Sequence, residues 1–310
     1  MGEKIENIII INNAFSLRWL KYLIRSLTIQ KCIENFLIIL IDYGNDLLDL
    51  INIVKQGNLN VILISQRGKD LGSANQRNLG ALFAINIINN FKYILFIDSD
   101  IVFLNTNILC KLNNLTKKLK ILGFSHVLFN FNNTVQWCCA QLLGPLLFEF
   151  KTIKKRGTDF LHGAFLSLNY EAVYEIYSTR KYIFPPFFFI GFDDYLLSLE
   201  LRKKYRLGRR DTFPVFNLGK ILHIGGSTTP RISERRLREA MKNLFLCFIL
   251  SNNKIRLIGI IPEYMVFSIL RNMLNGKLNI FTALKSLVQG LVDGILYWHQ
   301  VKLKHSVYIS

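Results

Sequence analysis

The sequence predicts a doubly wound α/β domain followed by a basic, amphipathic helical region. Short apolar runs alternate with amphipathic segments through the N-terminal third of the chain, a pattern typical of parallel strands that are buried on both faces. Polar residues follow several of these runs directly, which is where open α/β sheets bind ligands. With 310 residues, 51% of them hydrophobic, the chain can form one large domain with an extension or two small domains.

The elements follow one another in a regular order at first. The predicted strands are the apolar runs 7–12, 37–41, 61–64 and 93–97. The helices between them are 17–27 after a capping Ser16, 47–55 before Gly57, and 73–88. A helix at 108–120, a strand at 161–168, a short helix after Asn169, a helix at 193–204 and a strand at 218–224 follow, while 130–156 allows no assignment. Strands that alternate with helices in this way predict βαβ units.

The strand at 93–97 runs directly into Asp98-Ser99-Asp100. Two carboxylates at the carboxyl end of a buried strand suit a hard divalent cation, Mg²⁺ or Mn²⁺. A plain polar turn is the alternative, because Asp and Ser are common turn residues. His223 ends a later strand before a Gly-Gly-Ser loop, which makes it a candidate third ligand, although a single histidine is more often structural.

Two other junctions carry polar residues. Asp42 follows the second strand, where an acid can accept hydrogen bonds from a nucleobase or ribose. Arg77 lies near the start of the third helix, where a cation and backbone amides can receive a phosphate. The alternatives are a helix cap at Asp46 and a surface charge at Arg77. The sequence lacks the GxGxxG and GxxxxGK[ST] patterns, which disfavours a dinucleotide fold and a P-loop.

The helix at 193–204 begins with two acids, Asp193 and Asp194. Acids are stabilised at a helix N-terminus by the helix dipole, and in a crevice one of them could instead act as a general base on an acceptor hydroxyl. The aromatic loop 184–192 before them predicts either a lid or acceptor platform, or ordinary core packing.

Taken in order, these signals resemble a GT-A glycosyltransferase of family 2, within it the rhamnosyltransferase-like branch. The motifs are Asp42, Arg77-Asn78-x-Gly80, Asp98-x-Asp100, Gly163-Ala164, Asp193-Asp194 and His223-x-Gly-Gly-Ser227. The resemblance implies a GT-A, Rossmann-like domain with a mixed central sheet at 1–227 and a helical extension at 228–310. It also implies inverting transfer of a sugar from a nucleotide-diphosphate donor to an acceptor hydroxyl, on a glycan or lipid-linked acceptor of the cell envelope.

The resemblance also implies a role for each matching residue. Asp42, Arg77, Asn78, Asp98, Ser99, Gly163 and Ala164 would bind the nucleotide sugar, and Asp98, Asp100 and His223 would hold Mn²⁺ or Mg²⁺. Asp194 would be the general base, with Asp193 as the alternative. Leu196 replaces a third acid of the family pattern, and Pro185-Pro186 replaces an acidic segment upstream. These departures leave the choice between the two aspartates open.

The composition bears on partners and compartment. The net charge of +18 indicates an anionic partner, such as an acidic membrane surface or phosphorylated substrates. Five cysteines without metal-ligand spacing predict free thiols in the cytosol. The interrupted apolar helices after Arg231 are expected to lie in a membrane interface at the inner face of the cell membrane, or to pack on the catalytic domain or a second copy of the chain. We find no uninterrupted apolar run of about 18 residues, the length of a membrane span.

Two other functions are disfavoured. A nucleotidyltransferase would need a basic, glycine-rich loop after the first strand, and 12–18 has no glycine and one basic residue. A nucleic-acid-binding protein fits the charge, but zinc-finger, RRM-like and helix-turn-helix patterns are missing. A non-catalytic protein on the glycosyltransferase fold remains a third alternative.

Overall fold

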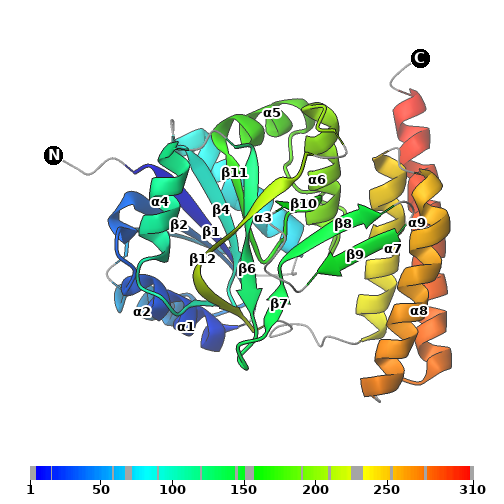
Figure 1. The fold of residues 1–310 in the computed structure, drawn as a ribbon, viewed down its shortest axis with the longest axis horizontal. Helices are drawn as coiled ribbons and strands as arrows, with labels where there is room; N and C mark the ends of the chain where they lie inside the picture. The colour runs from blue at the N-terminus through cyan, green and yellow to red at the C-terminus, as the bar shows by residue number, and fades with distance from the viewer. Residues whose placement is uncertain are drawn as a thin grey trace.

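The computed structural model shows a mixed α/β domain with helices α7, α8 and α9 packed at one side of it (Figure 1). It describes residues 5–14, 16–57, 59–66, 72–88, 91–118, 121–143, 146–150, 157–189, 191–208, 211–224, 233–251, 254–275 and 278–307. The predicted Gly225-Gly226-Ser227 loop and Arg231 lie outside these residues.

The described strands form a mixed central sheet, as predicted. One half is parallel, in the order β3 (Val61–Gln66), β2 (Phe36–Tyr43), β1 (Asn7–Ala14) and β4 (Tyr93–Asp98). The other half continues through antiparallel β11 (Phe165–Asn169) to β6 (Gly123–Phe129), β12 (Phe213–His223) and β10 (Gly157–Thr158). Strand β5 (Ile101–Phe103) pairs with β12, and β7 (Val135–Trp137) pairs with β6. Strands β8 (Cys139–Leu143) and β9 (Leu146–Phe150) form a separate hairpin sheet.

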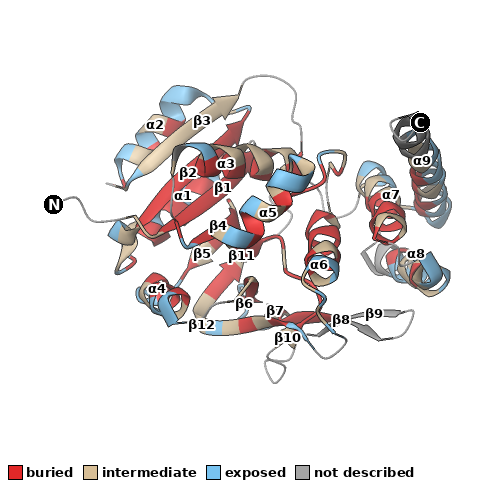
Figure 2. Cartoon of the chain, turned by 90° about the horizontal axis from the view of Figure 1, so that it is seen from above, coloured by how far each residue is buried: buried red, intermediate tan, exposed pale blue. Residues whose placement is uncertain are grey.

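Helices cover both faces of the sheet, which explains why the strands are apolar throughout. Ile9 and Ile11 of β1 pack in the cluster that includes α1 (Leu17–Thr28), α2 (Leu47–Lys55) and α4 (Ile108–Lys118). Ile8 and Ile10 pack in the cluster that includes α3 (Ser73–Ile87), α5 (Tyr170–Arg180) and α6 (Asp193–Lys204). Successive strand residues point to opposite faces, and Figure 2 shows β1, β2 and β4 as buried strands between the helices, with β3 at the partly exposed edge.

Strand β1 is the topological switch point of the parallel half. The chain passes from β1 to β2 on one side and returns to β4 on the other, which leaves a crevice at the carboxyl ends of these strands. The register places Asn12 beside Asp98 and Asn13 beside Asp42. The polar residues that end these strands therefore lie side by side at one edge of the sheet.

The predicted strand at 161–168 is wrong in its first half, since β11 begins at Phe165. The reason lies in Gly163, whose backbone groups bond to side chains and not to a neighbouring strand. Its N–H donates to Asp194 Oδ2 and its carbonyl accepts from Arg77 Nη2. The segment left unassigned contains β7, β8 and β9, and β12 begins five residues before the predicted Leu218, at Phe213.

The expectation of five free thiols is wrong at Cys32 and Cys110, which form a disulfide. The two residues are 78 positions apart, and the segment after α1 lies against the loop before α4, where the backbone N–H of Lys31 donates to the carbonyl of Thr106. Gln30 Nε2 donates to the carbonyl of Asn105 over 2.8 Å in the same contact. The cysteines therefore give no support to a reducing compartment, and the cytoplasmic location stays a prediction.

The C-terminal extension consists of α7 (Glu234–Leu250), α8 (Leu257–Asn275) and α9 (Ile280–Val307). Among the described helices, α9 contains one segment, Ile280–Gln300, that is long and apolar enough to cross a membrane by length and composition alone. Core helices of soluble proteins meet the same criterion, and one side of α9 packs along α7.

Candidate active site

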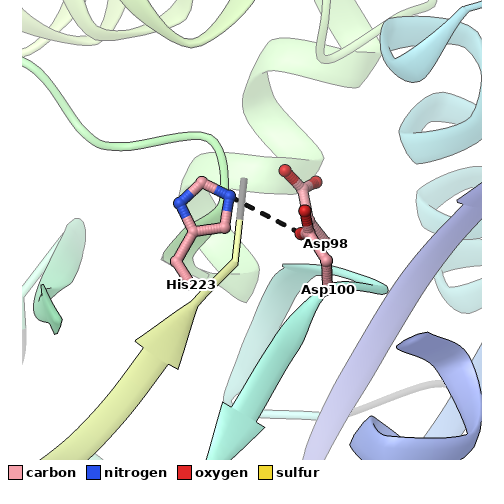
Figure 3. A group of neighbouring side chains, drawn as sticks. All are labelled: Asp98, Asp100 and His223. Carbon is pink, nitrogen blue, oxygen red and sulfur yellow. Dashed lines mark ion pairs between the residues drawn. The ribbon is translucent and has the colours of Figure 1, made fainter. Parts of the chain in front are cut away.

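Asp98, Asp100 and His223 converge at the crevice (Figure 3), as the sequence predicted. Asp98 ends β4, Asp100 lies in the following turn, and His223 is the last residue of β12. Pairing of His223 with Ile101 of β5 brings the histidine next to the aspartates. His223 Nε2 lies 3.5 Å from Asp100 Oδ1, and one ligand atom from each of the three residues lies within 4.8 Å of the others.

This donor set fits a divalent cation. Carboxylate oxygens suit Mg²⁺ and Mn²⁺, and imidazole nitrogen is a ligand for transition metals. Burial alone would raise the pKa of Asp98, but the charges of Arg77 and His223, with a hydrogen bond from Asn12, lower it below its usual value. Asp98 is therefore ionised at neutral pH. Arg77 and Asn12 both donate to its Oδ1, so Oδ2 can serve another ligand.

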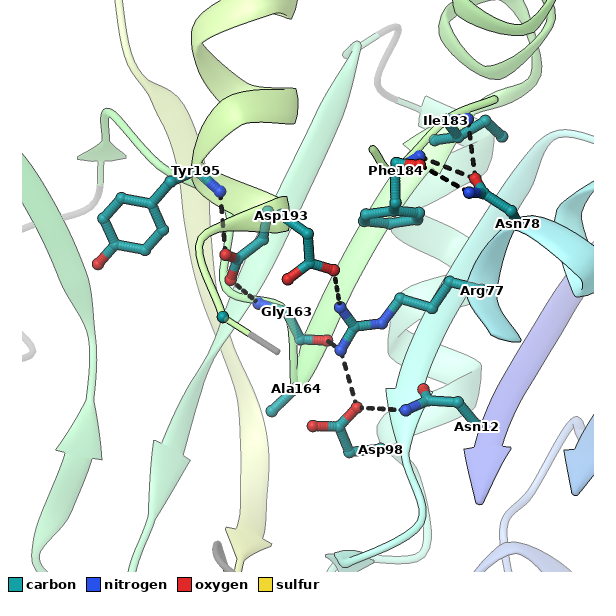
Figure 4. A network of polar contacts seen from close by, with 12 residues as sticks. Asn12, Arg77, Asn78, Asp98, Gly163, Ala164, Ile183, Phe184, Asp193 and Tyr195 are labelled. Atoms are coloured by element: carbon teal, nitrogen blue, oxygen red, sulfur yellow. Dashed lines mark hydrogen bonds and ion pairs between the residues drawn. The ribbon is translucent and has the colours of Figure 1, made fainter. Parts of the chain in front are cut away.

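Arg77 connects this group to the acids of α6 (Figure 4). Its guanidinium donates to Asp193 Oδ2 over 2.7 Å, to Asp98 Oδ1 over 2.9 Å and to the carbonyl of Gly163 over 3.0 Å. Burial would lower the pKa of Arg77, but Asp193 and Asp98 raise it, so the side chain stays charged. Arg77 is 4% exposed, so the surface-charge alternative is wrong.

The two acids at the start of α6 have different surroundings. Asp193 is paired with Arg77, whereas Asp194 accepts hydrogen bonds from the backbone N–H groups of Gly163 (2.6 Å) and Tyr195 (2.9 Å). Burial, together with the adjacent charge of Asp193, raises the pKa of Asp194 to about 7, against the lowering effects of Arg77 and the two N–H groups. A carboxylate with this pKa can accept a proton at neutral pH and release it again.

Other predicted residues lie at the same edge. Asp42 is fully buried and accepts from the side-chain amides of Asn13 (2.5 Å) and Asn45 (2.7 Å). Ser99 is buried between the two aspartates, and the carbonyl of Ala164 accepts from the backbone N–H of Asp98 over 3.1 Å. Their roles in nucleotide-sugar binding stay predictions. Asp46 does cap α2, since its side chain accepts from the N–H of Leu48.

Asn78 does not join this group. Its side chain accepts from the backbone N–H groups of Ile183 and Phe184 and donates to the carbonyl of Phe184 (Figure 4). Three hydrogen bonds to one backbone segment fix the beginning of the loop before α6. These contacts are structural, and they give no support to the prediction that Asn78 binds the donor.

The aromatic loop mainly packs in the core. Phe184 and Phe188 are fully buried, and Phe184 contacts Phe96 of β4 edge to face with ring centroids 4.9 Å apart. The lid or platform alternative is therefore wrong for these two rings.

Three residues that the sequence analysis missed belong to the site. Asn12 donates to Asp98 over 3.0 Å, and the available signal was its position directly after an apolar run, as for Asp98. The His162 ring lies 4.6 Å from Trp137 and 6.0 Å from His223, centroid to centroid. Burial, with the nearby charge of His223, lowers the pKa of His162 to about 3. His162 is therefore neutral and, with Trp137, forms an aromatic wall beside the candidate metal ligands.

Solved structures of several glycosyltransferases share this fold. S. aureus TarS superposes with a TM-score of 0.54 at 15% identity over 79% of this chain, which spans 40% of that TarS chain. S. aureus TarS 1-349 in complex with UDP-GlcNAc gives 0.63 at 14% identity, over 94% of this chain and 80% of that one.

A mannosyltransferase of Pyrobaculum calidifontis, PcManGT in complex with GDP-Man and Mn²⁺, gives a TM-score of 0.57 at 9% identity, over 94% of this chain and 87% of the mannosyltransferase. No protein-family model matches the sequence, and no curated protein does. At these identities the likeness shows a shared fold, a Rossmann-like α/β domain with a curled mixed sheet.

Proposed function

We propose that this protein is a glycosyltransferase that moves a sugar from a nucleotide-diphosphate donor to an acceptor hydroxyl. The observation that carries the proposal is the convergence of Asp98, Asp100 and His223 with the acid pair of α6 through Arg77. It brings a candidate cation site and a candidate proton acceptor together at the edge of the sheet where open α/β folds bind ligands. The likeness to structures that hold UDP-GlcNAc, or GDP-Man with Mn²⁺, supports the same reading.

On the donor side, Asp98, Asp100 and His223 would hold Mn²⁺ or Mg²⁺, which when bound would neutralise charge on the diphosphate leaving group as a Lewis acid. Asp42 would accept hydrogen bonds from the nucleoside. Gly163 lets the Asp194 carboxylate and the Arg77 guanidinium approach the backbone closely. A Cβ at this position would meet Asp194 Oδ2 at 2.9 Å and the Arg77 guanidinium at 3.2 Å. Gly163 is therefore required for the bonds that position both side chains.

On the acceptor side, we assign Asp194 as the general base. Direct displacement with inversion needs one base, which takes the proton of the attacking hydroxyl. Asp193 is held in an ion pair with Arg77, and an ion-paired carboxylate is a weaker proton acceptor. The pKa of about 7 at Asp194 matches the task.

The proposal also covers the class of acceptor and the location of the enzyme. We propose a glycan or lipid-linked acceptor of the cell envelope and a cytoplasmic location, and we keep the rhamnosyltransferase-like branch as the subgroup whose motifs this chain resembles. The charge of +18 is consistent with phosphorylated substrates, since it raises the local concentration of anions.

A donor screen by thermal shift tests the proposal. The melting temperature would be measured with UDP, UDP-GlcNAc, GDP and GDP-Man, each with and without Mn²⁺, for the wild type and for Asp100→Ala. A donor at about 100 times its Kd stabilises the folded state by about 2.7 kcal/mol, which corresponds to a shift of several degrees. We expect a Mn²⁺-dependent shift that Asp100→Ala loses.

Release of nucleoside diphosphate with a glycan or lipid-linked acceptor would then establish transfer. The proposal is wrong if no nucleotide sugar shifts the melting temperature of the wild-type protein in the presence of Mn²⁺.

A further inference from the structure

The exposed side chains of α8 are apolar wherever the structure describes them. Ile258, Val266, Leu270 and Met273 are spaced eight, four and three residues apart and lie on one side of the helix. They are 78%, 55%, 49% and 55% exposed, and Phe267 beside them is 65% exposed. Every residue of α8 whose burial is described as exposed is apolar. A helix side that faced only water would carry polar side chains.

Helix α9 continues this surface. Phe281, Leu284, Val288, Val292 and Ile295 recur at helical spacing and are between 38% and 83% exposed. Together with the α8 row they form a surface that we call the outer apolar face. Single exposed apolar residues are ordinary, but rows of exposed apolar residues on two helices that pack together are typical of an interaction site.

The opposite side of α9 already has a partner, so its orientation is fixed. Ala283 and Leu287 are fully buried. A Cβ at Gly290 would meet the carbonyl oxygen of Arg238 on α7 at 2.2 Å, and one at Gly294 would meet the Phe245 ring at 2.9 Å. Glycines at these two positions let α9 approach α7 closely, which leaves the outer apolar face directed away from α7 (Figure 2).

We propose that the outer apolar face binds the surface of an anionic lipid bilayer. Charge decides between a bilayer and a second copy of the chain. Over 254–307, Lys and Arg outnumber Asp and Glu by seven to two, and Lys254 and Lys285 are exposed next to the apolar rows. Anionic headgroups attract such a region, whereas a symmetric dimer through this face would bring together two chains of charge +18.

The helices lie in the bilayer surface and do not cross it. Asp293 of α9 pairs with Arg238 of α7, with 2.5 Å between Oδ2 and Nε, and Lys285 lies within the apolar segment. Crossing the bilayer would place these charges in hydrocarbon at a high cost. A helix with one apolar side and basic residues near it is the usual form of an interfacial helix.

This surface is coupled to the acid pair. Asn243 of α7 donates to the carbonyl of Gly191 over 3.2 Å, and Tyr297 of α9 contacts Phe187 with ring centroids 5.2 Å apart. Tyr264 of α8 contacts Phe192, the residue before Asp193, at 5.8 Å. A bilayer bound to α8 and α9 would therefore contact the same helices that pack on the loop leading to the acid pair.

Vesicle flotation with the full-length chain tests the proposal. The protein would be mixed with vesicles of phosphatidylcholine alone, or of phosphatidylcholine with phosphatidylserine, at low and high salt. The test variant is Phe267→Glu/Phe281→Glu, and the matched control is Leu48→Glu/Phe131→Glu. Leu48 and Phe131 are 70% and 65% exposed on the sheet domain, so the control adds the same charge elsewhere. Circular dichroism would verify that all variants are folded.

We expect the wild type to float with the anionic vesicles at low salt, and less so with neutral vesicles or at high salt. The test variant should lower the partition coefficient about tenfold or more, because it removes two apolar anchors, while the control stays near wild type. The proposal is overturned if the wild-type protein remains in the soluble fraction. It is also overturned if the test and control double variants lose vesicle binding equally. A wild-type dimer that the test variant dissociates, without vesicle binding, would identify the face as an interface between copies.

Vesicle binding requires no sugar transfer. The inference can therefore fail while the proposed function stands, and it can hold for a chain that has lost catalysis.

Discussion

Replacement of Arg77 by methionine should destabilise this protein more than most single substitutions. Arg77 is 4% exposed and pairs with Asp193 and Asp98, whose side chains are 4% and 28% exposed. Removal of one partner from a buried ion pair costs about 3–5 kcal/mol, because the remaining charge is left buried without compensation. Asp193 accounts for most of this cost because it is the less exposed partner. We expect a loss of about 4 kcal/mol, or a melting temperature lower by about 8 °C.

The stability lost in Arg77→Met should depend on pH, and the pKa of Asp98 determines whether that loss grows or shrinks as the pH falls. Arg77 holds the pKa of Asp98 below its usual value of 3.8, so this pair contributes its full stability above that value and loses it as the pH falls through the lowered pKa. In Arg77→Met the effect of burial remains and raises the pKa of Asp98. Acidification from pH 7 towards pH 4 then neutralises the partly buried carboxylate of Asp98 in the variant alone, and the stability gap to the wild type should narrow.

Urea denaturation followed by circular dichroism at both pH values measures the effect. Arg77→Met/Asp193→Leu should recover part of the loss, because the second substitution removes the uncompensated carboxylate. Arg238→Met, which removes the exposed arginine of the Arg238–Asp293 pair, is the matched control and should shift the midpoint little. A single variant as stable as the wild type, with no recovery in the double variant, would refute the arrangement of Arg77 described above.

Three other predictions concern the site and the disulfide. Asp194→Asn should lower kcat by about 10²–10⁴ with little change in donor Kd. In the wild type, kcat should rise as the pH passes about 7, since only the ionised carboxylate accepts a proton, so a flat profile would count against Asp194. Asp100→Ala should abolish sugar transfer, while the melting temperature without ligand, measured by calorimetry, stays unchanged. A large drop in that melting temperature would mean that Asp100 has a structural role. Reduction of the Cys32–Cys110 disulfide, which closes a loop of 78 residues, should lower stability by about 4 kcal/mol, and a melt insensitive to dithiothreitol would show that the bond does not form.

The sequence predicted the elements whose signals are local. The isoleucines of β1 and the apolar run of β4 allow few alternatives to a strand buried on both faces, and both strands are present. Helices α2 and α6 have the predicted bounds, because each begins with acids and ends with basic residues. The convergence of Asp100 and His223 followed from the rule that the ends of strands meet at one edge of a sheet, and their atoms lie 3.5 Å apart.

The partners of these residues could not be predicted, because they depend on packing between distant segments. Arg77 and Asp193 are 116 residues apart, and no local pattern distinguishes a buried arginine from an exposed one. Cys32 and Cys110 become neighbours only after α1 and α4 are placed on the same face of the sheet. His162 had a signal in its position before Gly163, but its contact with Trp137 joins two segments that the periodicity did not resolve.

Arg77 and Asn78, in one turn of α3, together hold the acid pair of α6 in place. They are consecutive, so their side chains leave the helix in different directions. Arg77 bonds directly to Asp193, while Asn78 fixes the backbone of Ile183 and Phe184 at the start of the loop before α6. Asn243 of α7 bonds to Gly191 at the other end of that loop. The start of α6 is therefore held from the sheet domain and from the C-terminal helices, so a substitution at Asn78 should disturb turnover through the placement of Asp194 and not through loss of a donor contact.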